Sequence, residues 1–140
     1  MPTVIPNLHF HGRCREALDL YRRALGAEVT LMLHYSDAKP ADFQFPRPLT
    51  EEQKDYVYHA EMEVGGQRLM CSDSMAPVPR GQNLSLVIVF PDPEDVKAAY
   101  SMLQTGGTVL VPPSDLTYSS CFASVIDRYG MRWELMTEDK

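Results

Sequence analysis

The sequence is poor in basic residues and has no long apolar run. Lysine and arginine number 13 against 19 aspartate and glutamate residues, which gives a net charge of −6. No basic cluster is present, and this argues against nucleic acid and anionic membranes as main partners. No apolar run approaches the roughly 20 residues of a transmembrane helix, and the start MPTVIPNL lacks the basic and apolar segments of a signal peptide.

Cysteine is also scarce. Cys14, Cys71 and Cys121 are odd in number, and their spacing matches neither a disulfide framework nor a metal knuckle. Together with the missing secretory signal, this predicts a protein of the reducing cytoplasm. A Ser-His-Asp order, a phosphate-binding loop and a metalloprotease motif are absent too, so no common motif indicates an activity.

The chain does contain enough apolar residues for a core. Hydrophobic residues make up 44% of 140 residues, which suits one globular domain, and we predict a single domain over residues 1–140. Residues 35–55 contain three prolines and little periodicity, and a connection this long is typical of a functional flap. Thr50 and Gln53 fit a capping box, which predicts a short helical turn at its end.

One pattern occurs twice. Residues 56–73, YVYHAEMEVGGQRLMCSD, and residues 119–137, SSCFASVIDRYGMRWELMT, each contain two alternating runs joined by a glycine-bearing turn. Each predicts a β-hairpin. The preceding segments predict strand, helix and strand, at 3–10, 13–25 and 27–34 in the first half and at 84–90, 92–104 and 108–111 in the second. Residues 112–118 are predicted to form a loop.

Both halves therefore have the order βαβββ. We predict an α+β fold of two tandem βαβββ units, residues 1–74 and 83–140, joined by a linker at 75–82. Their strands are expected to form a cupped eight-stranded mixed sheet with the helices outside. An open sheet leaves edges and apolar surface that a second subunit would cover, so a homodimer is expected.

Three segments carry a resemblance to a known family. NLHFHGRCREALDLYRRALGAE, YHAEMEVGGQRLMCSD and VIDRYGMRWEL look like the PhnB-like branch of the vicinal oxygen chelate superfamily, which includes glyoxalase I, extradiol dioxygenases and bleomycin-resistance proteins. The resemblance implies a homodimer with a cavity beneath each curved sheet. Family members often carry a methyltransferase label, but this chain has no Gly-rich turn that would hold a nucleotide-like cofactor.

The resemblance also indicates where a metal would bind. Metal-dependent members place one ligand on the first and one on the last strand of each unit, and the equivalent positions here are Asn7, Met70, Ser85 and Glu134. Only Glu134 is an ordinary ligand for a hard or borderline cation. We therefore predict no metal and no other cofactor, although a divalent ion could bind through substitute ligands.

Substitute residues lie near these positions. His9, His59 and Glu61 are expected on the same face as Asn7 and Met70, so His59 beside Glu61 could be a general base or an unusual metal ligand. The alternative is a hydrogen-bonded histidine on a solvated sheet face or at a dimer contact.

Glu134 stands alone between apolar neighbours on a strand that should be central. Desolvation would raise its pKa unless Arg132 or Arg68 pairs with it.

Two functions remain open on these observations. One is a small-molecule-binding protein of the bleomycin-resistance type, with a ligand contacting Asn7, His9, Glu61, Met70, Ser85, Tyr118 and Arg132. The other is a lyase, isomerase or dioxygenase-like enzyme that acts on a small oxygenated metabolite through Glu134 and His59. Tyr118, Phe43 and Phe45 are candidates to cover the ligand in either case.

Overall fold

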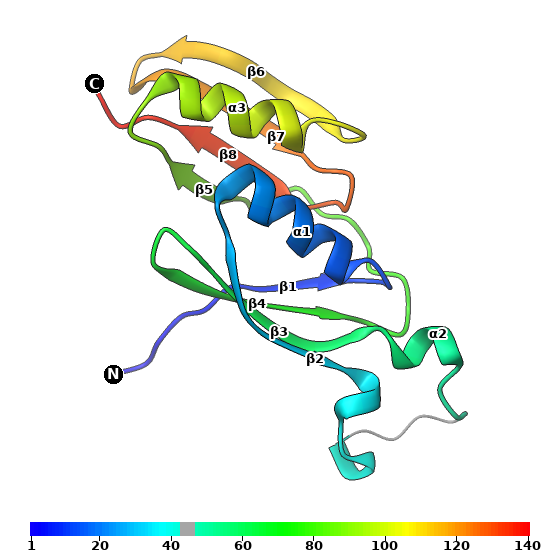
Figure 1. Cartoon of the computed structure of the whole chain (residues 1–140). Coiled ribbons are helices and arrows are strands. Elements are labelled where there is room, and N and C mark those ends of the chain that lie inside the picture. The colour runs from blue at the N-terminus through cyan, green and yellow to red at the C-terminus, as the bar shows by residue number, and fades with distance from the viewer. Residues whose placement is uncertain (43–46) are drawn as a thin grey trace. The chain divides into compact units, whose positions relative to one another are not determined.

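The computed structural model describes residues 1–42 and 47–140, and these residues contain the βαβββ order twice (Figure 1). The chain divides into two compact units. Unit 1 comprises Met1–Arg22 and Gly26–Val78, and unit 2 comprises Arg23–Leu25 and Pro79–Lys140. Among the described residues, no helix has the length and apolar character needed to span a membrane.

Unit 1 has a four-stranded mixed sheet. Its main elements are β1 (Asn7–Phe10), the first nine residues of α1 (Cys14–Leu25), β2 (Glu28–His34), β3 (Val57–Val64) and β4 (Gln67–Asp73). The strand order is β1-β4-β3-β2, with β1 parallel to β4 and the other pairs antiparallel. The first and the last strand of the unit therefore lie side by side.

The segment between β2 and β3 contains short helical pieces. Two 3₁₀ turns, Tyr35–Asp37 and Pro40–Asp42, follow β2, and α2 (Glu51–Lys54) precedes β3. The predicted capping box is confirmed, because Gln53 N donates to Thr50 Oγ1 at 3.1 Å and Thr50 N donates to Gln53 Oε1 at 3.0 Å. Phe43 and Phe45 lie outside the described residues.

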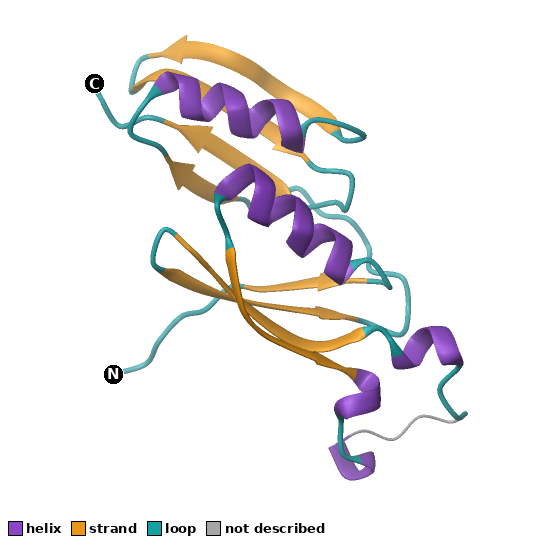
Figure 2. Ribbon diagram, viewed as in Figure 1, coloured by secondary structure: helices purple, strands orange, loops and turns teal. Residues whose placement is uncertain are grey.

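Unit 2 repeats the topology. Its elements are β5 (Leu86–Val89), α3 (Pro93–Leu103), β6 (Thr108–Leu116), β7 (Ser119–Ile126) and β8 (Arg132–Met136). The strand order is β5-β8-β7-β6, with β5 parallel to β8. Within this unit α3 lies along the sheet against β7 and β8 (Figure 2). The prediction of tandem βαβββ units with eight strands is confirmed, and the strands divide into two four-stranded sheets.

The predicted loop at 112–118 is wrong. β6 continues through Pro112 and Pro113 to Leu116, and its pairing with β7 is interrupted by three register shifts. β6 is an edge strand, where a proline without an N–H group is tolerated because one side of the strand has no partner in the sheet. Only the two residues Thr117 and Tyr118 connect β6 to β7.

Alternation along the strands decides which residues form the core. In unit 1 Leu8 and Phe10 are buried while Asn7 and His9 are exposed, and the Phe10 ring lies 6.5 Å from that of Tyr21 in α1. In unit 2 Trp133 and Leu135 of β8 are fully buried. The turn between β3 and β4 uses Gly65 and Gly66, both with positive φ (56° and 83°), the conformation of a two-residue hairpin turn.

Candidate functional site

Two rows of paired side chains cross the sheet of unit 1 on the face opposite Leu8 and Cys71. The first row consists of Leu31, Glu61, Met70 and Asn7, one residue from each strand. The second row contains Leu33 paired with His59, and Ser72 paired with His9. We call these eight residues the unit 1 rows. They bring together all five candidates predicted for the first half.

His59 and Glu61 form a close pair on β3. His59 Nε2 lies 2.8 Å from Glu61 Oε2, and Arg68 Nη1 on β4 lies 3.6 Å from Glu61 Oε1. The Glu61 side chain is only 19% exposed, whereas the Arg68 side chain is about half exposed. The carboxylate is therefore bound on both oxygens, and one ring nitrogen of His59 is held by it. This arrangement orients an imidazole in the manner of a carboxylate–histidine pair.

The corresponding face of unit 2 has a different composition. Its first row consists of Val111, Ser124, Glu134 and Val87, and its second row consists of Ser114, Phe122, Met136 and Val89. We call these eight residues the unit 2 rows. Glu134 and Ser124 are the central pair of the first row and lie on β8 and β7. Unlike the unit 1 rows, these rows contain a single ionisable residue.

Glu134 is held by Arg132 through one oxygen only. Arg132 Nη2 lies 3.2 Å from Glu134 Oε1, and Arg132 Nη1 donates to the carbonyl oxygen of Gln82 at 2.7 Å. The Glu134 side chain is 14% exposed. Its second oxygen, Oε2, is buried and has no hydrogen-bond partner among the described residues, and the same holds for the hydroxyl of Ser124, a residue that is 1% exposed. These two oxygens are thus buried without partners among the described residues, and so is Nε of the neighbouring Arg132.

Ser85 does not occupy the position predicted for it. Val87 pairs with Glu134, just as Asn7 pairs with Met70, so Val87 is the counterpart of Asn7 in unit 2. Ser85 precedes β5 and lies outside the strand. The sequence alignment of the two halves was two residues off, because a shift of two keeps the apolar alternation of the strand intact.

Tyr118 lies in the turn between β6 and β7. Its side chain is exposed, and its ring centroid lies 6.1 Å from that of Phe122 in an edge-to-face arrangement. Tyr118 therefore borders the unit 2 rows at one end, through Phe122. Its role as a ligand cover stays a prediction.

The donors implied by the superfamily do not fit a divalent metal. Among residues 1–42 and 47–140, no three His, Cys, Asp or Glu side chains lie close enough to hold one ion. In unit 1 the paired positions Asn7 and Met70 offer an amide and a thioether, and in unit 2 the paired positions Val87 and Glu134 offer a hydrocarbon and a carboxylate. Hard and borderline cations prefer imidazole and several carboxylates.

Two buried aspartates were not identified from the sequence. Asp73 Oδ1 accepts from Cys14 N at 3.0 Å and Asp73 Oδ2 from Val57 N at 2.9 Å, which joins α1 and β3 to the end of β4. Asp127 accepts from the indole Nε1–H of Trp133 at 2.9 Å and from two backbone N–H groups of the β7–β8 turn. Both carboxylates hold backbone segments in place by accepting hydrogen bonds from N–H groups. Their places at strand ends were the only sequence signal.

The cysteines show no sign of a nucleophile. The pKa of Cys14 is raised far above its usual value, first by a hydrogen bond with Cys71 and then by burial. Burial likewise raises the pKa of Cys121. A thiol with a raised pKa carries little thiolate at neutral pH.

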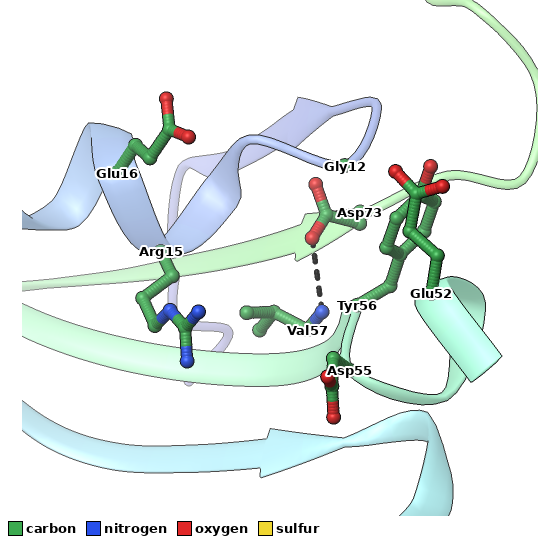
Figure 3. A pocket seen from close by; sticks show the side chains of 8 residues that line it. All are labelled: Gly12, Arg15, Glu16, Glu52, Asp55, Tyr56, Val57 and Asp73. Atoms are coloured by element: carbon green, nitrogen blue, oxygen red, sulfur yellow. Dashed lines mark hydrogen bonds between the residues drawn. The ribbon is translucent and has the colours of Figure 1, made fainter.

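A cavity of about 210 Å³ lies elsewhere in unit 1 (Figure 3). Arg15 and Glu16 of α1, Glu52, Asp55 and the Asp73 carboxylate line it, and the dashed line in the figure is the bond from Val57 N to that carboxylate. None of the residues predicted from the sequence as site residues lines it. Since Asp73 is already satisfied by backbone N–H groups, we assign this cavity no role.

Comparisons with known proteins agree with this architecture. The model of the Glyoxalase/Bleomycin resistance protein/Dioxygenase superfamily matches residues 9–135. Protein YjdN of Escherichia coli K12 is 25% identical over 142 residues, which cover 91% of this chain and 90% of YjdN. The crystal structure of PA1353 from Pseudomonas aeruginosa has a TM-score of 0.82 at 28% identity, with 99% of this chain and 98% of that chain covered. The PhnB protein from Bacillus cereus has the same fold, with a TM-score of 0.78 at 22% identity and 97% and 99% coverage.

Proposed function

Because the chain belongs to the glyoxalase/bleomycin resistance protein/dioxygenase superfamily, we propose that it is a small-molecule-binding protein whose ligand contacts the face of unit 2 that carries Glu134. The resemblance to the PhnB-like branch supports the same class of fold. The ligand is bound by side chains of the chain itself, without a resident divalent metal.

One observation carries this proposal. Glu134 Oε2 and the Ser124 hydroxyl are buried and lack partners among the described residues. A buried polar group without a partner costs roughly 1–3 kcal/mol, and the cost is greater for a charged group. A ligand group that satisfies both oxygens would remove this cost, so the two groups favour binding over a purely structural face.

A thermal-shift screen of small metabolites tests the proposal. A ligand that binds the native state raises the melting temperature. We expect that the shift produced by a hit is largely lost in Glu134→Gln and is kept in Glu138→Gln, a matched change at an exposed carboxylate near the C-terminus. Hits that shift both variants as strongly as the unchanged protein would contradict the site.

The second candidate is an enzyme, and the 2.8 Å contact of His59 with Glu61 is the observation that favours it. An oriented imidazole can act as a general base, which contributes roughly 10²–10⁴-fold to a rate. If a hit from the screen is turned over, His59→Ala should lower the turnover number by about that factor while binding is largely kept. A binding protein would show only a modest change in affinity and no turnover.

The metal prediction follows from the donor set. One carboxylate already paired with arginine offers little to offset the dehydration of Zn²⁺, Ni²⁺ or Mn²⁺. We expect no stoichiometric metal in the purified protein and no rise in melting temperature with micromolar amounts of these ions. About one metal per chain by elemental analysis, lost on Glu134→Gln, would show that substitutes such as His9 or His59 complete a site.

A further inference from the structure

The first of the unit 2 rows is polar in the middle and apolar at both ends. Ser124 and Glu134 stand between Val111 on β6 and Val87 on β5, and the Val87 side chain is 53% exposed. The neighbouring row adds three apolar side chains, Phe122, Met136 and Val89, and ends in Ser114, whose hydroxyl donates to the carbonyl oxygen of Pro112 at 2.6 Å. A molecule bound over this face would meet mainly hydrocarbon around the two central oxygens, and the Arg132 guanidinium beside Glu134 would be a charged donor near it.

Charge is already balanced beside these oxygens. Arg132 pairs with Glu134 at 3.2 Å through Oε1, so the negative charge of the carboxylate has its counter-ion within the protein. A cationic ligand group at Oε2 would place a second positive charge near the guanidinium and would lose its hydration in an apolar setting. The ligand group therefore needs no charge.

Glu134 Oε2 and the Ser124 hydroxyl differ in the hydrogen bonds that they can make with a ligand. Glu134 Oε2, as a carboxylate oxygen, only accepts, whereas the Ser124 hydroxyl can donate or accept. A hydroxyl group on the ligand can donate to Oε2 and accept from Ser124 at the same time. An ammonium group can only donate, and an ether can only accept.

We propose that the face around Glu134 and Ser124 binds a neutral, mainly apolar molecule through a single hydroxyl group. This inference rests on the proposed function and specifies the class of its ligand. Both oxygens are buried, so a neighbouring side chain has to move when the hydroxyl enters. Met136, partly buried in the adjacent row and unbranched, is suited to that movement.

Three probes that differ in one group test the inference. Benzyl alcohol, toluene and benzylammonium share an aromatic body and carry a hydroxyl, no polar group and a cation. Their dissociation constants can be measured by NMR from the signals of Val87, Val89 and Phe122. We expect benzyl alcohol to bind about tenfold more tightly than toluene or benzylammonium, because one good hydrogen bond to a charged acceptor accounts for roughly that factor.

Two serine variants locate the effect. Ser124→Ala removes one hydroxyl from the first of the unit 2 rows and should weaken the binding of benzyl alcohol by less than about tenfold, because the bond to Glu134 remains, while leaving toluene unchanged. Ser101→Ala, at an exposed position of α3, is the matched control and should bind all three probes as the unchanged protein does. Equal losses in both variants would overturn the assignment.

The outcomes separate this inference from the proposed function. If toluene and benzyl alcohol shift the same signals with equal dissociation constants, the hydroxyl assignment is wrong while binding on this face stands. If benzylammonium binds more tightly than benzyl alcohol, the face prefers a cation to a hydroxyl group, and the inference is also wrong. If no probe shifts these signals up to its solubility limit, both the inference and the choice of this face for the proposed function fail.

Discussion

Ser119 and Ser124 are two buried serines of β7 with opposite surroundings. The Ser119 hydroxyl donates to the carbonyl oxygen of Cys121 at 2.9 Å and accepts from Thr137 N at 3.1 Å. The Ser124 hydroxyl has no partner among the described residues. Since a buried hydrogen bond contributes about 1 kcal/mol and a buried group without one costs a similar amount, the two positions should respond differently to loss of the hydroxyl.

Ser124→Ala should raise the free energy of unfolding by about 1 kcal/mol, and Ser119→Ala should lower it by roughly 1–3 kcal/mol. Denaturation in urea measures both. A Ser124→Ala protein as destabilised as Ser119→Ala would mean that the Ser124 hydroxyl has a partner after all, such as a bound water.

Asp139 fixes the C-terminal residues onto β7. Hydrogen bonds from the Ser120 hydroxyl, from Ser120 N at 3.0 Å and from Thr137 Oγ1 at 2.8 Å lower the pKa of Asp139 from 3.8 to about 2. A lowered pKa in the folded state means that the contribution of this carboxylate is fully present above pH 3.8 and is lost as the pH falls through about 2.

The Ser120 amide signal should therefore titrate by NMR with a midpoint of about pH 2. Asp139→Asn should abolish this titration, and Glu138→Gln should not change it. A midpoint at the ordinary value of 3.8 would show that the tail is detached in solution.

At the scale of elements, Gly107 joins α3 to β6 where no side chain fits. A Cβ atom at this position would lie 2.2 Å from the carbonyl oxygen of Ile126 and 3.0 Å from Asp127 Cα. These are backbone atoms of β7 and of the turn that follows it, so they cannot rotate away. Gly81, by contrast, would meet only the Asn83 side chain, at 3.5 Å.

Gly107→Ala should lower the free energy of unfolding by about 1–3 kcal/mol, because the overlap forces α3 and β7 apart. Gly81→Ala should change it by no more than about 0.5 kcal/mol. Thermal or chemical denaturation of the pair checks the prediction, and equal stability of the two variants would contradict the tight approach at Gly107.

The alternation of apolar and polar residues predicted most strands. It did not fix the pairing between strands, because a shift of two residues leaves the alternation unchanged. The hairpin over Val57–Asp73 followed from its alternating runs and from Gly65-Gly66, and these features are local. Register between strands far apart in sequence is not local, so alternation alone predicts Ser85 at the position that Val87 occupies. The prolines predict an end of β6 at Val111, although an edge strand tolerates them and β6 continues to Leu116.

For the candidate site residues, too, the sequence predicts contacts within a strand but not contacts between strands. The contact of His59 with Glu61 was foreseeable, because residues two apart in a strand share a face. Ser124 was missed as a site residue, because only the pairing of β7 with β8 places it beside Glu134. The hydrogen bonds of Asp73 and Asp127 depend on where distant backbone lies, and nothing in the local sequence fixes that.

At the scale of the whole molecule, the homodimer stays a proposal. Among the described residues, the edge strands of the sheets are β1 and β2 in unit 1 and β5 and β6 in unit 2, and Val87 and Val89 of β5 are exposed. We expect light scattering to give twice the chain mass of 15.8 kDa. A mass of 15.8 kDa at high micromolar concentration would count against it.

The parallel pairs β1–β4 and β5–β8 have a consequence for synthesis on the ribosome. β1 can pair only after β4 has been synthesised, since Asn7 pairs with Met70. β5 can pair only after β8 has been synthesised, since Leu86 pairs with Trp133. Pairing of strands so distant in sequence is slow, because loop closure comes before any gain. Before it pairs, β1 has a polar residue at every second position, whereas β5, with the sequence Leu-Val-Ile-Val, has no polar residue. A nascent chain that stalls before β8 is made would therefore expose β5 as an unpaired apolar strand that is prone to aggregation. Any dependence of this protein on chaperones should come from β5.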